Sequence, residues 1–194
     1  MDALIALGTL ALIALAGPAT AHEAAGHAGG FVSGLTHPLF GWDHVIAMVA
    51  VGLWGAFLGK PAIWILPVVF PLVMALGAAL GVAGVPIPQV ETGIALSGVV
   101  LGLLVALAVK APLAVAGVVV GLFAVFHGHA HGTELPSAAN PFAYAAGFVI
   151  STGLLHLAGI GFGFATALPK GVYAVRAAGV VIAAVGTAFL TGAA

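Results

Sequence analysis

The sequence predicts an all-α, polytopic transmembrane helical bundle of about six spans that follow an N-terminal signal peptide. Of its 194 residues, 63% are hydrophobic and only 5% are Asp, Glu, Lys or Arg, whereas about 25% of the residues of a soluble domain are charged. The apolar residues form segments of about spanning length, and a shorter apolar segment comes first. A lipid bilayer is therefore the expected surrounding of this chain.

The first apolar segment is too short to cross a bilayer. It covers residues 3–16, against the roughly 20 residues that a spanning helix needs. Pro18-Ala19-Thr20-Ala21 follows it as a cleavage site of the A-x-A kind. We therefore predict a signal peptide at 1–21 and a single six-helix transmembrane domain at 22–194. Because Asp2 but no Lys or Arg precedes the segment, a retained hydrophobic helix is the alternative.

Six longer apolar segments follow, and proline or charged residues separate them. All the basic residues fall in or just beyond the first, third and fifth connections, on one side of the membrane. The positive-inside rule makes that side the cytoplasm, so the mature N-terminus and the C-terminus are predicted to be periplasmic, in a bacterial inner membrane. The segments are 38–59, 62–83, 92–109, 112–130, 142–164 and 171–191, and the basic residues are Lys60, Lys110, Lys170 and Arg176.

Small residues and prolines predict how these helices pack. Glycines four residues apart allow helix backbones to touch, and Pro67 and Pro71 predict a kink in the second span, because proline removes an amide donor from a helix. The kinked segment is either a structural helix or a carbonyl-lined pathway. The glycine pairs are Gly77/Gly81, Gly98/Gly102 and Gly117/Gly121.

The first mature span holds potential metal ligands. At 100° per residue, His37, His44 and Met48 fall within about 20° of one line on a helix. Asp43 lies about 100° from His44 on the same helix. A carboxylate within a span is costly unless it is paired or binds a cation. We therefore predict a cation site at Asp43 and His44, with a structural hydrogen bond as the alternative for Asp43.

A second group of potential ligands ends the fourth span. If the helix continues through this segment, His127, His131 and Glu134 share one face, whereas His129 points elsewhere. This spacing suits a divalent metal, and the negative end of the helix dipole favours a cation there. The alternative is a solvated histidine-rich loop.

Further residues are candidates for a pathway or for metal capture. Ser151, Thr152 and His156 lie in the fifth span, where a histidine can also simply bond a neighbouring helix. A third outer group lies near the predicted mature N-terminus. The pathway and capture candidates are Met48, Thr152, His156, His129, His22, Glu23 and His27.

Residue types and motifs that are missing narrow the function. The chain has no cysteine, so a metal site must use imidazole, carboxylate, thioether or backbone oxygen. A formal charge of -1 without a basic run argues against a nucleic-acid partner. Neither G-x-x-x-x-G-K-[ST] nor H-E-x-x-H occurs, so this chain is expected neither to hydrolyse nucleotides nor to be a zincin protease.

Both histidine motifs resemble those of the HupE/UreJ family of membrane proteins, which is associated with nickel uptake for hydrogenase and urease. The signature H-P-x-x-G-x-D-H is present as His37, Pro38, Gly41, Asp43 and His44. The signature F-H-G-x-A-H-G-x-E is present as Phe126, His127, Gly128, Ala130, His131, Gly132 and Glu134. The resemblance covers the whole chain and implies nickel permease activity, whereas spacing alone supports a divalent-metal site.

The expected function is a secondary transporter or facilitator, not an enzyme, that imports a divalent transition-metal ion from the periplasm. The resemblance implies Ni²⁺, with Co²⁺ as the alternative; imidazole also suits Zn²⁺. No tightly bound cofactor is required, and a homo-oligomer is left open. The rivals are an intramembrane zinc hydrolase and a metal-binding assembly subunit without transport. The predicted metal ligands are His37, Asp43, His44, His127, His131 and Glu134.

Overall fold

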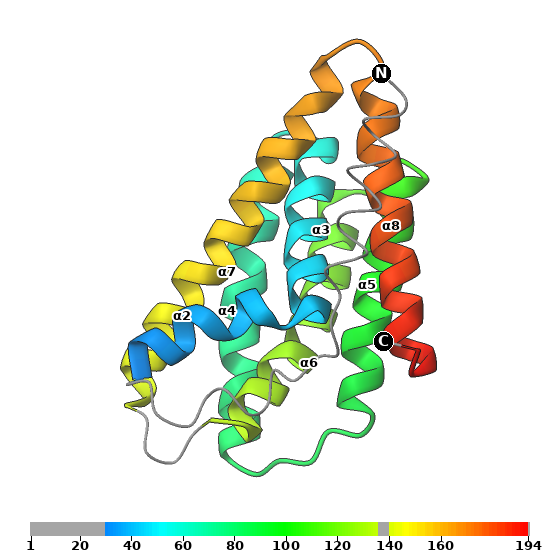
Figure 1. The fold of residues 1–194 in the computed structure, drawn as a ribbon. Helices are drawn as coiled ribbons and strands as arrows, with labels where there is room; N and C mark the ends of the chain where they lie inside the picture. Colours follow the sequence, from blue (N-terminus) through cyan, green and yellow to red (C-terminus); the bar gives the residue numbers. More distant parts are fainter. Residues whose placement is uncertain (1–29, 136–139, 194) are drawn as a thin grey trace.

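A computed structural model describes residues 30–135 and 140–193, and these residues form helices and no strand. The all-α prediction is thus confirmed for this part of the chain (Figure 1). The predicted signal peptide and the group of His22, Glu23 and His27 lie outside the described residues. The helices are α2 (Gly30–Phe40), α3 (Trp42–Leu58), α4 (Ala62–Val82), α5 (Val90–Ala106), α6 (Leu113–Thr133), α7 (Pro141–Gly163), the short 3-10 helix η1 (Phe164–Ala167) and α8 (Gly171–Thr191).

Several of these helices can cross a membrane. By length and composition α4, α6, α7 with η1, and α8 each qualify alone, and α2 with α3 forms a bent fifth candidate. The apolar helix α5 has 17 residues and is shorter than a typical span. The protein is therefore a multi-pass membrane protein with four or five candidate spans among the described residues, and the count of six stays a prediction.

The first predicted span is not one helix. It breaks at Gly41, which has an extended conformation (φ -84°, ψ 100°), and the helices on either side meet at 79°. Glycine is a poor helix former, and a Cβ here would lie 3.1 Å from both Asp43 Oδ1 and His44 Nδ1. The predicted single-helix stripe of His37, His44 and Met48 is therefore wrong, because His37 lies on α2 and the other two on α3.

Helices α4 and α6 pack backbone to backbone through glycines. A Cβ at Gly128 or Gly132 of α6 would overlap with the backbone of α4, at Gly132 with the carbonyl group of Ala78. A Cβ at Gly77 or Gly81 of α4 would in turn overlap with the backbone of α6. The four glycines therefore interlock the two helices, and the predicted packing role of the α4 pair is confirmed.

The other two predicted glycine pairs differ from each other. Gly98 and Gly102 of α5 face α8, where added Cβ atoms would lie 3.2 Å from the Gly186 Cα and 2.8 Å from the Gly179 carbonyl oxygen, respectively. A Cβ at Gly117 would meet nothing within 4 Å, and one at Gly121 would meet a valine side chain at 3.8 Å. The Gly117/Gly121 pair was therefore wrongly predicted as a packing contact, because sequence spacing does not show which face of a helix meets a neighbour.

This difference predicts the effects of two alanine substitutions in α6. We expect Gly128→Ala to lower the free energy of unfolding by about 1–3 kcal/mol, because a methyl group would push α4 and α6 apart. Gly117→Ala is the matched control and should leave it unchanged or slightly higher, because open space surrounds the site. Thermal denaturation of the purified protein in detergent, followed by circular dichroism, measures both. Equal melting temperatures for the two variants would contradict this packing.

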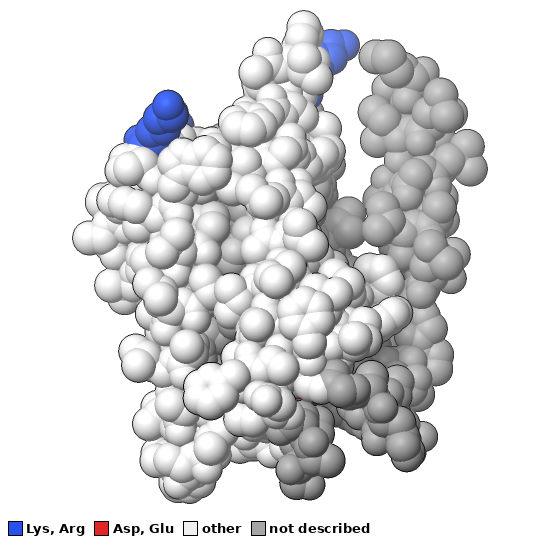
Figure 2. Space-filling model, turned by 90° about the vertical axis from the view of Figure 1, so that its left-hand side faces the viewer, with Lys and Arg blue, Asp and Glu red and all other residues white. Residues whose placement is uncertain are grey.

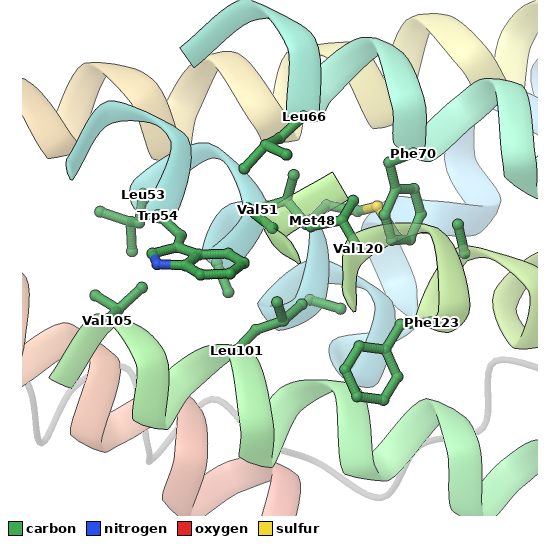
Figure 3. Close-up of a cluster of buried hydrophobic side chains, with 14 of the residues drawn as sticks. Met48, Val51, Leu53, Trp54, Leu66, Phe70, Leu101, Val105, Val120 and Phe123 are labelled. Atoms are coloured by element: carbon green, nitrogen blue, oxygen red, sulfur yellow. The ribbon is translucent and has the colours of Figure 1, made fainter. Parts of the chain in front are cut away.

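The apolar core surrounds α3 (Figure 3). This helix contacts α2, α4, α5, α7 and α8, and Leu53 and Trp54 are fully buried in it. The indole Nε1 of Trp54 donates a hydrogen bond to the Val109 carbonyl at 3.0 Å. Met48 is also fully buried, and its sulfur lies beside the ring of Phe70. Because α3 is central, residues at its start are carried into the interior of the bundle.

The basic residues gather at one end of the bundle. The α3–α4, α5–α6 and α7–α8 connections lie at the same end (Figure 1) and contain Lys60, Lys110 and Lys170. On the face drawn in Figure 2, basic side chains occur only at this end. This arrangement agrees with the predicted one-sided distribution of the basic residues. That this end is cytoplasmic stays a prediction.

Candidate metal site

Four histidine rings from three helices meet inside the bundle, and we call His37, His44, His127 and His131 the histidine cluster. The His44 ring centroid lies 4.6 Å from that of His131, 4.9 Å from that of His127 and 6.3 Å from that of His37. The centroids of His37 and His131 are 4.9 Å apart. His44, His127 and His131 are all buried. His44 therefore lies at the centre of the cluster.

Local backbone features bring these rings together. Helix α6 continues to Thr133, so His127 and His131 are one turn apart on one face, as the sequence predicted. Gly128 and Gly132 alternate with them and face α4, which leaves the histidines on the side toward α3. The bend between α2 and α3 returns His37 to the cluster. Each motif thus combines candidate ligands with the glycines that determine their direction.

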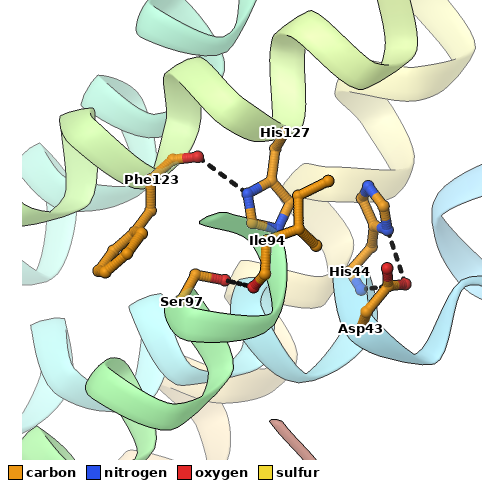
Figure 4. A network of polar contacts seen from close by, with 6 residues as sticks. All are labelled: Asp43, His44, Ile94, Ser97, Phe123 and His127. Carbon is orange, nitrogen blue, oxygen red and sulfur yellow. Dashed lines mark hydrogen bonds and ion pairs between the residues drawn. The ribbon is translucent and has the colours of Figure 1, made fainter. Parts of the chain in front are cut away.

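Asp43 orients the imidazole of His44. Its Oδ1 accepts hydrogen bonds from the His44 backbone N–H and from the ring Nδ1–H, each at 2.8 Å (Figure 4). A proton on Nδ1 leaves the lone pair on Nε2 available to a metal. The His44 Nε2 is buried, and no described residue hydrogen-bonds to it. In this structure Asp43 therefore acts on the cluster through His44.

A hydrogen bond from Nδ1 also fixes the tautomer of His127. Its Nδ1 donates to the Phe123 carbonyl at 2.9 Å (Figure 4), so the lone pair again falls on Nε2. That Nε2 and both ring nitrogens of His131 are buried without a hydrogen-bond partner among the described residues. Buried polar atoms are normally satisfied, and leaving them unsatisfied is costly. Three neighbouring imidazoles with this property fit a bound cation.

A carboxylate joins the outer part of the cluster. Glu134, the residue that directly follows α6, can offer a ligand atom together with His37 and His131, and these three atoms lie within 4.8 Å of one another. Of these three residues only Glu134 is exposed, and the buried His131 also contacts His44. The structure therefore brings together five of the predicted ligands. We call His37, His131 and Glu134 the shallow group and His44, His127 and His131 the deep group, so His131 belongs to both.

Other candidates lie outside the cluster. The His129 ring Nε2 donates to the Val85 carbonyl at 2.7 Å and ties α6 to the segment after α4, so it points elsewhere, as predicted. His156 and Thr152 are buried in α7, and their side-chain polar atoms have no hydrogen-bond partner among the described residues. Met48 lies in the apolar core.

Two aromatic residues of the site were not found from the sequence. The Phe148 ring centroid lies 4.2 Å from that of His131, and the Phe70 centroid lies 5.4 Å from that of His127. A phenylalanine in an apolar span carries no signal that separates a residue beside a metal site from a residue in the core. Only the packing of α4 and α7 against the cluster shows their position.

Comparison with known proteins agrees with the two histidine motifs. The profile of the family described as "HupE / UreJ protein" matches residues 10–189. The chain belongs to the HupE/UreJ family. Within this family, Protein HupE of Rhizobium leguminosarum bv. viciae is 49% identical over 185 residues, which cover 95% of this chain and 97% of that protein. No solved structure gives a significant match.

Family membership confirms the resemblance read from the motifs and supports metal transport as the general function. It agrees with a non-enzymatic role and with several membrane-crossing helices.

Proposed function

We propose that this protein is a secondary transporter or facilitator that imports Ni²⁺, with Co²⁺ as the alternative cargo. The histidine cluster is the observation that carries this proposal. The donors of this cluster are imidazoles, Glu134 beside it adds a carboxylate, and the described residues offer no thiolate. This set suits Ni²⁺, Co²⁺ and Zn²⁺ better than Cu⁺. The nickel association of the HupE/UreJ family supports Ni²⁺ among these ions.

The two overlapping groups of residues support a proposed order for the first steps. An ion enters at His37, His131 and Glu134, where a carboxylate and the C-terminal end of the α6 dipole attract positive charge. It then passes to His44 and His127 without leaving His131, which belongs to both groups. Exchanging one ligand at a time avoids the cost of releasing a bare divalent ion into an apolar interior.

The path continues toward the end of the bundle that carries the lysines. Met48, Thr152 and His156 lie on this course. Pro71 has no amide N–H, so the Pro67 carbonyl lacks its helical donor. We place the lysine end in the cytoplasm of a bacterial inner membrane, with the C-terminus periplasmic, which follows from the positive-inside rule.

Metal counterflow in proteoliposomes tests this function. Purified protein is reconstituted into vesicles loaded with unlabelled Ni²⁺, and entry of radioactive Ni²⁺ is followed against protein-free vesicles. A transporter accelerates entry. An intramembrane zinc hydrolase shows no counterflow and cleaves a substrate in a Zn²⁺-dependent manner, whereas an assembly subunit binds Ni²⁺ without moving it. Absence of counterflow under conditions where Ni²⁺ binds would therefore overturn the proposal.

Transport should depend on pH because a histidine ligand must be neutral to offer its lone pair. Protons compete with the metal, so the initial rate of Ni²⁺ uptake should fall as the external pH drops through about 6 to 6.5, where histidines commonly titrate. The rate is measured in proteoliposomes between about pH 7.5 and 5.5 with a constant internal pH. A flat profile over this range would count against histidine ligation.

A further inference from the structure

The ring of Phe70 lies between two separate groups of buried polar side chains. Its centroid is 5.4 Å from that of His127, which belongs to the histidine cluster. It is 5.6 Å from that of His156 on α7. Both contacts are edge-to-face, and Phe70 is fully buried. A single apolar ring therefore touches both histidines.

The group on the far side of the ring has the properties of a second ion station. Ser151, Thr152 and His156 are at most 1% exposed, and their hydroxyl oxygens and imidazole nitrogens have no hydrogen-bond partner among the described residues. Such atoms are costly to bury in an apolar bundle. An ion that passed through would provide the missing partner.

The helix backbone on both sides of Phe70 lacks hydrogen bonds because of two prolines. Pro67 precedes it by three residues and Pro71 follows it directly, both within α4. Each proline removes one amide donor, so the carbonyls of Ile63 and Pro67 lose their helical hydrogen bonds, and helices bend most readily at such positions. This turn of α4 can therefore shift with less loss of hydrogen bonding than the rest of the helix.

We propose that Phe70 is a gate between the histidine cluster and an inner station formed by His156, Thr152 and Ser151. The ring offers no ligand to Ni²⁺ and blocks a continuous polar path, as apolar constrictions do in channels. Movement of the kinked turn displaces the ring and lets the ion pass from His127 to His156. This inference rests on the proposed transport function, and it names the step that separates binding from release.

Substitutions that change the size of the ring test the gate. In the counterflow assay, Phe70→Ala should raise Ni²⁺ flux by about tenfold because the constriction is removed, and Phe70→Trp should slow it. Phe70→Leu, which keeps most of the volume, should give an intermediate flux if the alanine variant does not fold. The dissociation constant of Ni²⁺, measured by calorimetry in detergent, should stay unchanged in all three because the histidine cluster is intact.

Leu101→Ala is the matched control, because Leu101 is a fully buried residue of α5 in the same apolar core. This variant should leave the Ni²⁺ flux unchanged. Wild-type flux in the Phe70 variants that fold would overturn the gate. A change in the dissociation constant of Ni²⁺ that accounts for the whole change in flux would overturn it as well. Failure of the transport function is distinguishable, since the wild-type protein would then show no counterflow at all.

Discussion

Replacing His44 by alanine is expected to reduce Ni²⁺ accumulation to background. His44 is the ring that contacts the other three members of the histidine cluster, at centroid distances of 4.6 to 6.3 Å. Its loss removes the central residue of the proposed deep group. The decrease should exceed about 100-fold, because losing a residue that only orients a ligand already costs roughly 10- to 100-fold in metal affinity. Uptake of radioactive Ni²⁺ by whole cells, normalised to the amount of protein in the membrane, measures the effect.

His129→Gln provides a control in the same motif. His129 binds the Val85 carbonyl instead of joining the cluster, and a glutamine amide can donate to that carbonyl. We expect this variant to retain most of the uptake, with normal membrane abundance. Normal uptake in His44→Ala would show that the cluster is not the transport site.

The second large effect is expected for Asp43→Asn. Asp43 accepts the Nδ1 proton of His44, whereas an asparagine amide can instead donate to Nδ1 and place the proton on Nε2. Imidazole with a proton on Nε2 cannot bind a metal through that atom. The dissociation constant of Ni²⁺ should therefore rise by about 10- to 100-fold, as measured by calorimetry in detergent.

The size of this effect separates two roles for Asp43. The sequence pattern predicts Asp43 as a ligand, whereas in the structure its carboxylate accepts the Nδ1 proton of His44. An orienting role predicts a smaller loss of binding for Asp43→Asn than for His44→Ala. An equal loss would make Asp43 a direct ligand, and unchanged binding would contradict both roles.

The sequence by itself determined those features that depend on local chemistry. The chain has too few charged residues to cover the surface of a soluble protein, which predicted a membrane bundle. The i, i+4 spacing of His127 and His131 predicted one face of a helix, because the helical period is the same wherever the helix lies. The two motifs predicted the family and most of the residues that the structure brings together.

Tertiary structure alone decided which residues meet. The break at Gly41 replaces the expected stripe of His37, His44 and Met48, because a bend changes the direction of every residue beyond it. Glycine spacing alone did not separate the packed pair of α4 from the open Gly117/Gly121, and nothing in the sequence placed Phe70 between His127 and His156. These contacts join helices distant in sequence, so they depend on how closely backbones approach, which local pattern does not specify.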